Sequence, residues 1–94
     1  MKAPTYRGQR VDVLLDVRSR MEFLLGHLPG AICIPVDAVA TEVPRRTEIP
    51  RTAMILVYCQ SGARSARAVG ILRQLGYTHA ANGGGIADLK RELR

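Results

Sequence analysis

The sequence is poor in cysteine and aromatic residues and has no long apolar run. Its 94 residues include two cysteines, three tyrosines, one phenylalanine and no tryptophan. Cys33 and Cys59 are not in a Cys-x-x-Cys spacing, and two cysteines are too few for a disulfide framework or a zinc site. The longest apolar run, residues 54–57, is far shorter than the roughly 20 residues that cross a bilayer. The sequence therefore predicts no transmembrane helix and no metal.

Acidic side chains are also few in comparison with basic ones. There are 8 Asp and Glu against 14 Lys and Arg, which gives a formal net charge of +6, and 12 of the 14 cations are arginine. A basic surplus can recognise an acidic protein or RNA. The arginines are dispersed, however, and with four aromatics the chain is not expected to bind nucleic acid. We interpret Arg45-Arg46 and Lys90-Arg91 as solvated faces.

The length and composition indicate one folded domain. A chain of this size buries roughly 60–65% of its unfolded surface, which is enough for a single core. With 47% hydrophobic and 23% charged residues, the composition is that of a globular protein. We expect residues 1–94 to form one domain, with residues 1–10 poorly structured. The N-terminal residues resemble no secretion signal, so we expect a cytoplasmic monomer that does not bind a membrane.

Strand patterns alternate with helix patterns along the chain. Apolar, β-branched runs predict strands at residues 11–17, 31–34, 53–58 and 78–81. Four helices are predicted. The first begins at Ser19, the second covers residues 36–41, the third follows the turn after Cys59 and ends near Leu75, and the fourth covers residues 86–93. Glycines 83–85 are expected to break the last strand. This alternation predicts a parallel α/β sheet with right-handed crossovers, whose sites form where strands end and helices begin.

One such strand end carries a cysteine whose thiol could be reactive. Cys59 ends the most apolar strand and is followed by a glycine-bearing turn that opens a helix. Backbone amides of residues 60–65, the positive end of the helix dipole and Arg64 could stabilise a thiolate and bind an anion beside it. Gly62 permits the tight turn that such an arrangement needs. The alternative is that Cys59 is only a small buried apolar residue.

Five motifs in this order resemble a rhodanese (sulfurtransferase) domain over about residues 12–89. They are Asp16-Val17-Arg18, Glu22-Phe23 with Gly26-His27-Leu28-Pro29-Gly30-Ala31-x-x-Ile34-Pro35, Tyr58-Cys59-x-x-Gly62-x-Arg64-Ser65, Leu75-Gly76-Tyr77, and Asn82-x-Gly84-Gly85. The compact form is similar to the single-domain rhodaneses of the phage-shock-protein E type. The resemblance implies a three-layer fold with a small parallel sheet of four to five strands flanked by helices. No clear strand precedes Val11, which favours four.

The resemblance also implies a reaction and a site. The Cys59 thiolate would attack the outer sulfur of thiosulfate, release sulfite and become a persulfide, from which a thiol, cyanide or protein acceptor would take the sulfur. No cofactor is required. Cys59 is the catalytic residue, Asp16 and Arg18 are a supporting brace, and the donor would bind to Gln60, Ser61, Gly62, Ala63, Arg64 and Ser65.

Several other polar residues have simpler explanations. Glu22 is accounted for by a capping box with Ser19, and His27 is interpreted as a turn residue rather than a general base. Cys33 could act as a resolving thiol or be an ordinary buried strand residue. The glycines after Asn82 are expected to let that segment approach the loop after Cys59.

Two other functions fit parts of the pattern. A phosphatase or arsenate reductase also places a thiolate among backbone amides, but the tyrosine-phosphatase signature has five residues between Cys and Arg, whereas four separate Cys59 from Arg64. The shorter loop favours sulfur as the transferred group. A non-catalytic persulfide carrier or a binding module for a partner protein remains an alternative. The physiological donor and acceptor are left open by the sequence.

Overall fold

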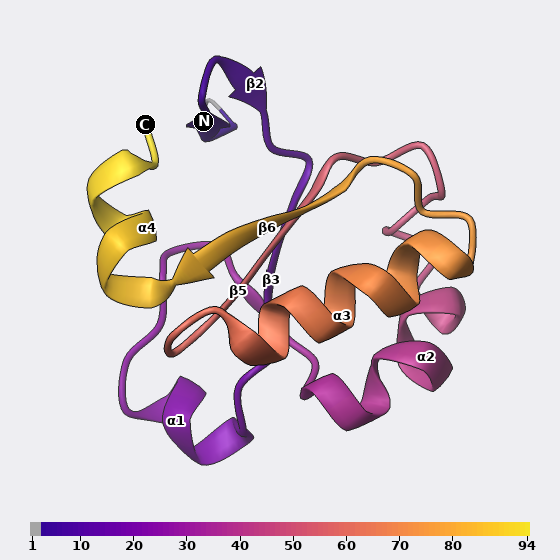
Figure 1. The fold of residues 1–94 in the computed structure, drawn as a ribbon, viewed down its shortest axis with the longest axis horizontal. Coiled ribbons are helices and arrows are strands. Elements are labelled where there is room, and N and C mark those ends of the chain that lie inside the picture. Colours follow the sequence, from indigo (N-terminus) through magenta and orange to yellow (C-terminus); the bar gives the residue numbers. More distant parts are fainter. Residues whose placement is uncertain (1–2) are drawn as a thin grey trace.

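A four-stranded parallel sheet forms the centre of the computed structural model, which describes residues 3–94 (Figure 1). The strand order is β4 (Ile32–Cys33), β3 (Val13–Asp16), β5 (Ile55–Cys59) and β6 (Ala80–Gly85). All three pairings are parallel. Every residue of β5 is buried, because a central parallel strand is covered on both faces and therefore consists of apolar residues throughout. The predicted α/β fold with four strands is confirmed.

Helices surround this sheet, and those other than α1 cover its two faces. They are α1 (Arg20–Leu24), the 3₁₀ turns η1 (Val36–Ala38) and η2 (Val43–Arg45), α2 (Val39–Glu42), α3 (Ala63–Gln74) and α4 (Ile86–Glu92). Side chains alternate along β3, so that Val13 and Leu15 pack with the residues of α2 and α3 while Leu14 packs with Leu89 of α4. This makes three layers, helix, sheet and helix. Over residues 3–94 none of these helices has both the length and the apolar character needed to span a bilayer.

The short helix α1 lies outside these layers, beside the end of β3 (Figure 1). None of its residues is buried, and Met21, Leu24 and Leu25 have exposed apolar side chains. Its N-terminus is closed by the predicted capping box, in which the Glu22 N–H donates to Ser19 Oγ at 3.2 Å and the Ser19 N–H donates to Glu22 Oε1 at 3.0 Å. With no core contact of its own, α1 depends on this cap and on polar contacts.

The N-terminal segment differs from the prediction that residues 1–10 are poorly structured. Strands β1 (Thr5–Tyr6) and β2 (Gln9–Arg10) form an antiparallel hairpin. Arg7 and Gly8 connect them with φ values of 51° and 81°, the left-handed pair that a two-residue hairpin turn requires. The hairpin is anchored because Tyr6 is buried against the α4 side of the sheet. Residues 1 and 2, on which part of that prediction falls, lie outside the described residues.

The glycine run does not break the last strand, so that prediction is wrong. β6 continues through residue 85, with Gly84 paired to Tyr58 and Gly85 paired to Cys59 after a register shift. A Cβ on Gly85 would lie 2.7 Å from the Gln60 carbonyl oxygen, and one on Gly62 would lie 3.5 Å from Gly84 Cα. Glycine is needed here because two backbone segments approach closely.

Candidate active site

Cys59 lies at the carboxyl end of β5, at the entrance to the loop that leads into α3 (Figure 1). Its residue surface is only 1% exposed. The N–H groups of Gly62 and Ser65 donate to its Sγ, at 3.0 and 3.4 Å. Gly62 is the residue before α3 and has a φ of 102°, a left-handed conformation that turns its N–H toward the sulfur. We call these two amides and the sulfur between them the amide cradle.

The amide cradle changes the acidity of the thiol. Burial raises the pKa of Cys59, while the backbone N–H groups of Ser65, Gly62 and Ser61 lower it, and on balance the pKa lies below its ordinary value of 9.0. Donors aimed at a sulfur stabilise its anion. The lowered pKa increases the thiolate fraction of Cys59 at neutral pH.

Asn82 of β6 is linked to the Cys59 sulfur through the side chain of Ser65. The fully buried Ser65 has its Oγ 3.4 Å from Cys59 Sγ and donates its hydroxyl proton to Asn82 Oδ1 at 2.7 Å. The same Oδ1 accepts the Gly84 N–H at 2.8 Å. Asn82 thus connects β6 to the amide cradle, a role that sequence reasoning did not assign to it. The only signal in the sequence was an asparagine directly before the glycine run.

Arg64 points away from the cradle toward α1, where it forms a two-armed ion pair. Its Nη1 and Nη2 donate to the two carboxylate oxygens of Glu22 at 2.7 and 2.9 Å. Arg64 and the Ser19 backbone lower the pKa of Glu22 to about 2. The capping box therefore explains only part of what Glu22 does. Sequence reasoning missed the pair because 42 residues separate its members.

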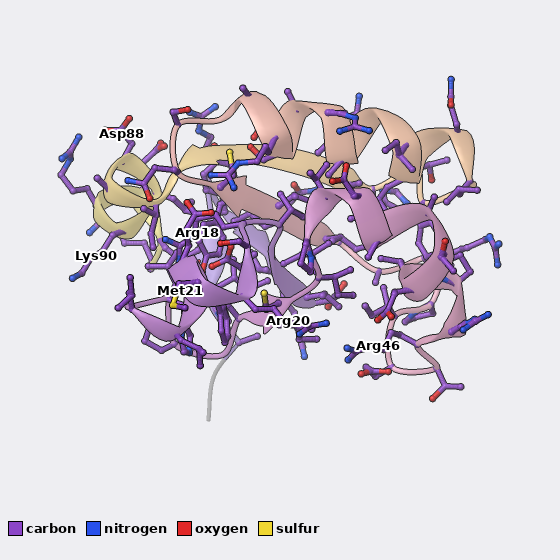
Figure 2. The ribbon with its side chains drawn as sticks, turned by 90° about the horizontal axis from the view of Figure 1, so that it is seen from below. Arg18, Arg20, Met21, Arg46, Asp88 and Lys90 are labelled. Carbon is purple, nitrogen blue, oxygen red and sulfur yellow. The ribbon has the colours of Figure 1, made fainter. Side chains whose placement is uncertain are left out.

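Asp16 and Arg18 form a buried ion pair at the end of β3. Their residues are 0% and 4% exposed, and Arg18 donates from Nη2 to Asp16 Oδ2 at 2.8 Å and to the Gly26 carbonyl at 2.7 Å. Arg18 Nη1 also approaches Gln60 Oε1 at 3.4 Å, its one hydrogen bond to the loop after Cys59 within residues 3–94. Figure 2 shows Arg18 next to α1, between the helix and the sheet. This arrangement supports the predicted brace.

The remaining predicted loop residues have exposed side chains. Gln60, Ser61 and Ala63 are exposed, and of the three the Ser61 backbone acts on the Cys59 thiol. The labelled Arg46 and Lys90 lie at opposite sides of the molecule in Figure 2. Over residues 3–94 no group of three or more His, Cys, Asp or Glu side chains could hold a metal ion.

Two candidates lie apart from the cradle. His27 stacks on Phe23 with ring centroids 3.6 Å apart and has Nδ1 2.9 Å from the Phe23 carbonyl, as a turn residue would. Cys33 is buried in β4, with β3 between it and β5. Neither residue contacts the reactive sulfur.

Comparison with known proteins gives consistent matches over most of the chain. The family model described as the rhodanese-like domain matches residues 3–92. The chain is 37% identical over 79 residues to thiosulfate sulfurtransferase PspE of Escherichia coli, covering 80% of the chain and 71% of the relative. It is 36% identical over 80 residues to human thiosulfate:glutathione sulfurtransferase, covering 73% and 70%. The solved structure of the human single-domain sulfurtransferase TSTD1 superposes with a TM-score of 0.76 at 29% identity, covering 85% and 81%.

Proposed function

The chain belongs to the rhodanese family and is a thiosulfate sulfurtransferase, and from that premise we propose that Cys59 is the residue that carries the sulfur. One observation carries this assignment. Its sulfur accepts hydrogen bonds from two backbone N–H groups at the start of α3, at 3.0 and 3.4 Å. Such donors stabilise a developing negative charge. The alternative that Cys59 is only a buried apolar residue does not explain this convergence.

The reaction has two displacements. The Cys59 thiolate attacks the outer sulfur of thiosulfate, the bond between the two thiosulfate sulfurs breaks, and sulfite leaves with the electron pair. Cys59 then carries an anionic persulfide. An acceptor thiolate attacks the outer persulfide sulfur, the bond between the two persulfide sulfurs breaks, and Cys59 is left as a thiolate within the amide cradle. With cyanide as acceptor the same step yields thiocyanate.

The amide cradle acts in both displacements. The Gly62 and Ser65 amides donate to the thiolate before attack and to the inner sulfur again when Cys59 leaves the persulfide. Because these donors are fixed by the turn before α3, they need no rearrangement as charge moves. The backbone of residues 60–65 surrounds the position where the outer sulfur would be held.

Arg64 is proposed to bind the oxyanion end of the donor. Its side chain is 38% exposed and lies in the first turn of α3, directly after the loop that follows Cys59. In the donor-free state Glu22 neutralises it, so the donor must compete with a carboxylate for the same fork of N–H groups. Asp16 and Arg18 are proposed to hold the loop from beneath, through Gln60.

The proposed substrates are small anionic sulfur donors and nucleophilic acceptors. Thiosulfate or a persulfide would supply the sulfur, and a thiol, cyanide or a protein thiol would accept it. The +6 net charge attracts small anions over long range, an effect that added salt weakens. We propose that residues 1–94 form one domain and act as a monomer.

The assignment is tested by giving the protein thiosulfate and cyanide and measuring thiocyanate. The expected result is turnover that is abolished in Cys59→Ser and retained in Cys33→Ser, the matched control. Mass spectrometry after thiosulfate alone should show a gain of about 32 Da on Cys59. A gain of sulfur without turnover would indicate a persulfide carrier instead. Activity undiminished in Cys59→Ser would refute the role of that residue.

A further inference from the structure

The Ser65 hydroxyl has one proton and three acceptors around it. Its oxygen lies 2.7 Å from Asn82 Oδ1, 3.0 Å from the Gly62 carbonyl oxygen and 3.4 Å from Cys59 Sγ. The residue is fully buried, so water does not supply a substitute. Where this proton points decides whether Ser65 presents a donor or an acceptor to the sulfur.

Asn82 takes the proton because its amide is fixed. The Gly84 N–H donates to Oδ1 at 2.8 Å, which identifies that atom as the oxygen, and Nδ2 lies 3.4 Å from the Gly62 carbonyl. Oδ1 can therefore only accept from Ser65. The Gly62 carbonyl accepts both the Ala66 N–H at 3.0 Å and Asn82 Nδ2 at 3.4 Å, whereas Oδ1 accepts one N–H, from Gly84, and so has capacity left for the Ser65 proton.

This geometry suits the thiol more than the thiolate. With its proton on Asn82, the Ser65 oxygen presents a lone pair to Sγ and can accept the Cys59 S–H. When the thiol ionises, the best arrangement turns the Ser65 proton to the sulfur, but then Asn82 Oδ1 and Ser65 Oγ face each other at 2.7 Å with no proton between them. Asn82 would have to give up the Gly84 N–H to relieve this contact.

We propose that Asn82 is a positioning residue that directs the Ser65 hydroxyl away from Cys59 and thereby favours the protonated thiol, against the two amides that favour the thiolate. These opposing influences on the Cys59 pKa affect both displacements. A more basic thiolate is a stronger nucleophile toward the donor sulfur, whereas a less basic one leaves the persulfide faster. Asn82 sets the balance between the two displacements.

The charged groups near the Cys59 sulfur would not be altered by a substitution of Asn82. Arg64, in the first turn of α3, is neutralised by Glu22 of α1, while Asp16 and Arg18 pair with each other at the end of β3. The segment of β6 in this region, from Ala80 to Gly85, has no titratable side chain. A change at Asn82 therefore alters hydrogen bonding without altering charge.

The test is the pH dependence of Cys59 alkylation by iodoacetamide, in the Cys33→Ala background so that one thiol reacts. Asn82→Ala should lower the midpoint by about half a unit to one unit, the size of one hydrogen bond. Above the midpoint its rate should be about twofold slower, because the thiolate is less basic. Asn82 is exposed, so the change opens no cavity, and Asn82→Ser should shift the midpoint in the same direction.

A double-mutant cycle separates this role from loosening of the loop. In Ser65→Ala protein, Asn82→Ala should leave the midpoint unchanged. Arg73→Met is the matched control, since Arg73 ties α3 to β6 through the Ala80 carbonyl at 2.9 and 3.1 Å without touching Ser65. It should lower stability and leave the midpoint where it is. A midpoint that rises or stays in Asn82→Ala, or a shift that persists without Ser65, would overturn the proposal.

The inference rests on the proposed role of Cys59, but the two can fail separately. Alkylation reports the thiol directly and requires no sulfur transfer. A shifted midpoint in a protein whose Cys59 takes no sulfur from thiosulfate would refute the proposed function and keep the role of Asn82. An unshifted midpoint in an active enzyme would do the reverse.

Discussion

Glu22 binds the guanidinium of Arg64 with both carboxylate oxygens, at 2.7 and 2.9 Å, and so joins α1 to the first turn of α3, directly after the loop that follows Cys59. The pair is partly exposed, with side chains that are 33% and 38% accessible. Exposed pairs contribute little to stability. The ion pair therefore matters chiefly for the proposed role of Arg64, under which the donor must displace a carboxylate to reach the guanidinium.

Glu22→Gln should lower the KM for thiosulfate by about two- to fivefold, the range expected for the loss of one partly exposed ion pair. Glutamine preserves the capping box with Ser19, so α1 should stay folded while Arg64 becomes free. Arg64→Ala should raise the KM by about tenfold or more, because a charge-assisted hydrogen bond to the donor is lost. Steady-state thiocyanate formation measures both.

Arg67→Ala is the control for this pair. Arg67 is also on α3 and forms an exposed ion pair, but its partner is Asp37, at 3.2 Å, rather than a residue of α1. Its loss should leave the KM unchanged. Because the pKa of Glu22 is lowered to about 2, the Glu22 pair is complete above its ordinary value of 4.5 and is lost as pH falls toward 2. The effect of Glu22→Gln on the KM for thiosulfate should thus be constant across neutral pH. A raised KM in this variant would contradict competition between Glu22 and the donor for Arg64.

Local patterns were sufficient to predict the strands β3, β4 and β5, the capping box and the loop after Cys59. The apolar run of β5 and the Ser19 to Glu22 spacing each reflect forces between residues close in sequence. The Glu22 to Arg64 pair was missed because only the folded sheet brings its members together. The glycine run was misread for a similar reason, since the need for glycine at position 85 arises from the carbonyl of Gln60, 25 positions earlier.

The lowered pKa of Cys59 should make its contribution to stability depend on pH. The folded thiol ionises at lower pH than the unfolded one, so the unfolded state holds more protons between the two values. Stability gained from the thiolate therefore grows as pH rises through this interval and is complete above 9.0, the ordinary value. The Tm of the wild type minus that of Cys59→Ser should increase over the same range. A difference that shrinks with rising pH would contradict the amide cradle.

Gly85→Ala should damage the loop, whereas Gly70→Ala should strengthen the fold. A Cβ at Gly85 would meet the Gln60 backbone oxygen at 2.7 Å, while one at Gly70 meets nothing within 4 Å. Sulfur loading should slow on the order of ten- to a hundredfold in Gly85→Ala because the cradle is displaced. Gly70 is inside α3, so alanine there should add about 0.5–1 kcal/mol of stability with loading unchanged. Persulfide formation and urea denaturation measure the two effects, and wild-type loading in Gly85→Ala would contradict the close approach of β6.

Asp16→Asn should destabilise the protein by about 3–5 kcal/mol, because it leaves the Arg18 charge buried without its partner. Asparagine has the same shape, so the loss reflects charge rather than packing. Adding Arg18→Met should recover part of that stability, since the uncompensated charge is then removed. Urea denaturation of the single and double variants measures this. An Asp16→Asn protein as stable as the wild type would show that the pair is not a brace.

Cys33 should take no part in the reaction, although it is the one other thiol in the sequence. Asp16 of β3 is in register with Cys33 on one side and with Tyr58, the neighbour of Cys59, on the other. Two strand spacings place the cysteines roughly 9–10 Å apart, beyond the about 7 Å that a disulfide tolerates. Burial, reinforced by Asp16, also raises the pKa of Cys33 and keeps it protonated.

Cys33→Ala should therefore turn over thiosulfate and cyanide like the wild type, with a loss of about 1 kcal/mol in stability from the smaller side chain. The decisive measurement is the mass of persulfide-loaded wild type held without acceptor. The added sulfur should stay on Cys59, because a resolving thiol would have to displace it as sulfide and leave an internal disulfide. Such a disulfide in the wild type, absent from Cys33→Ala, would require β3 to move aside and would make Cys33 part of the mechanism.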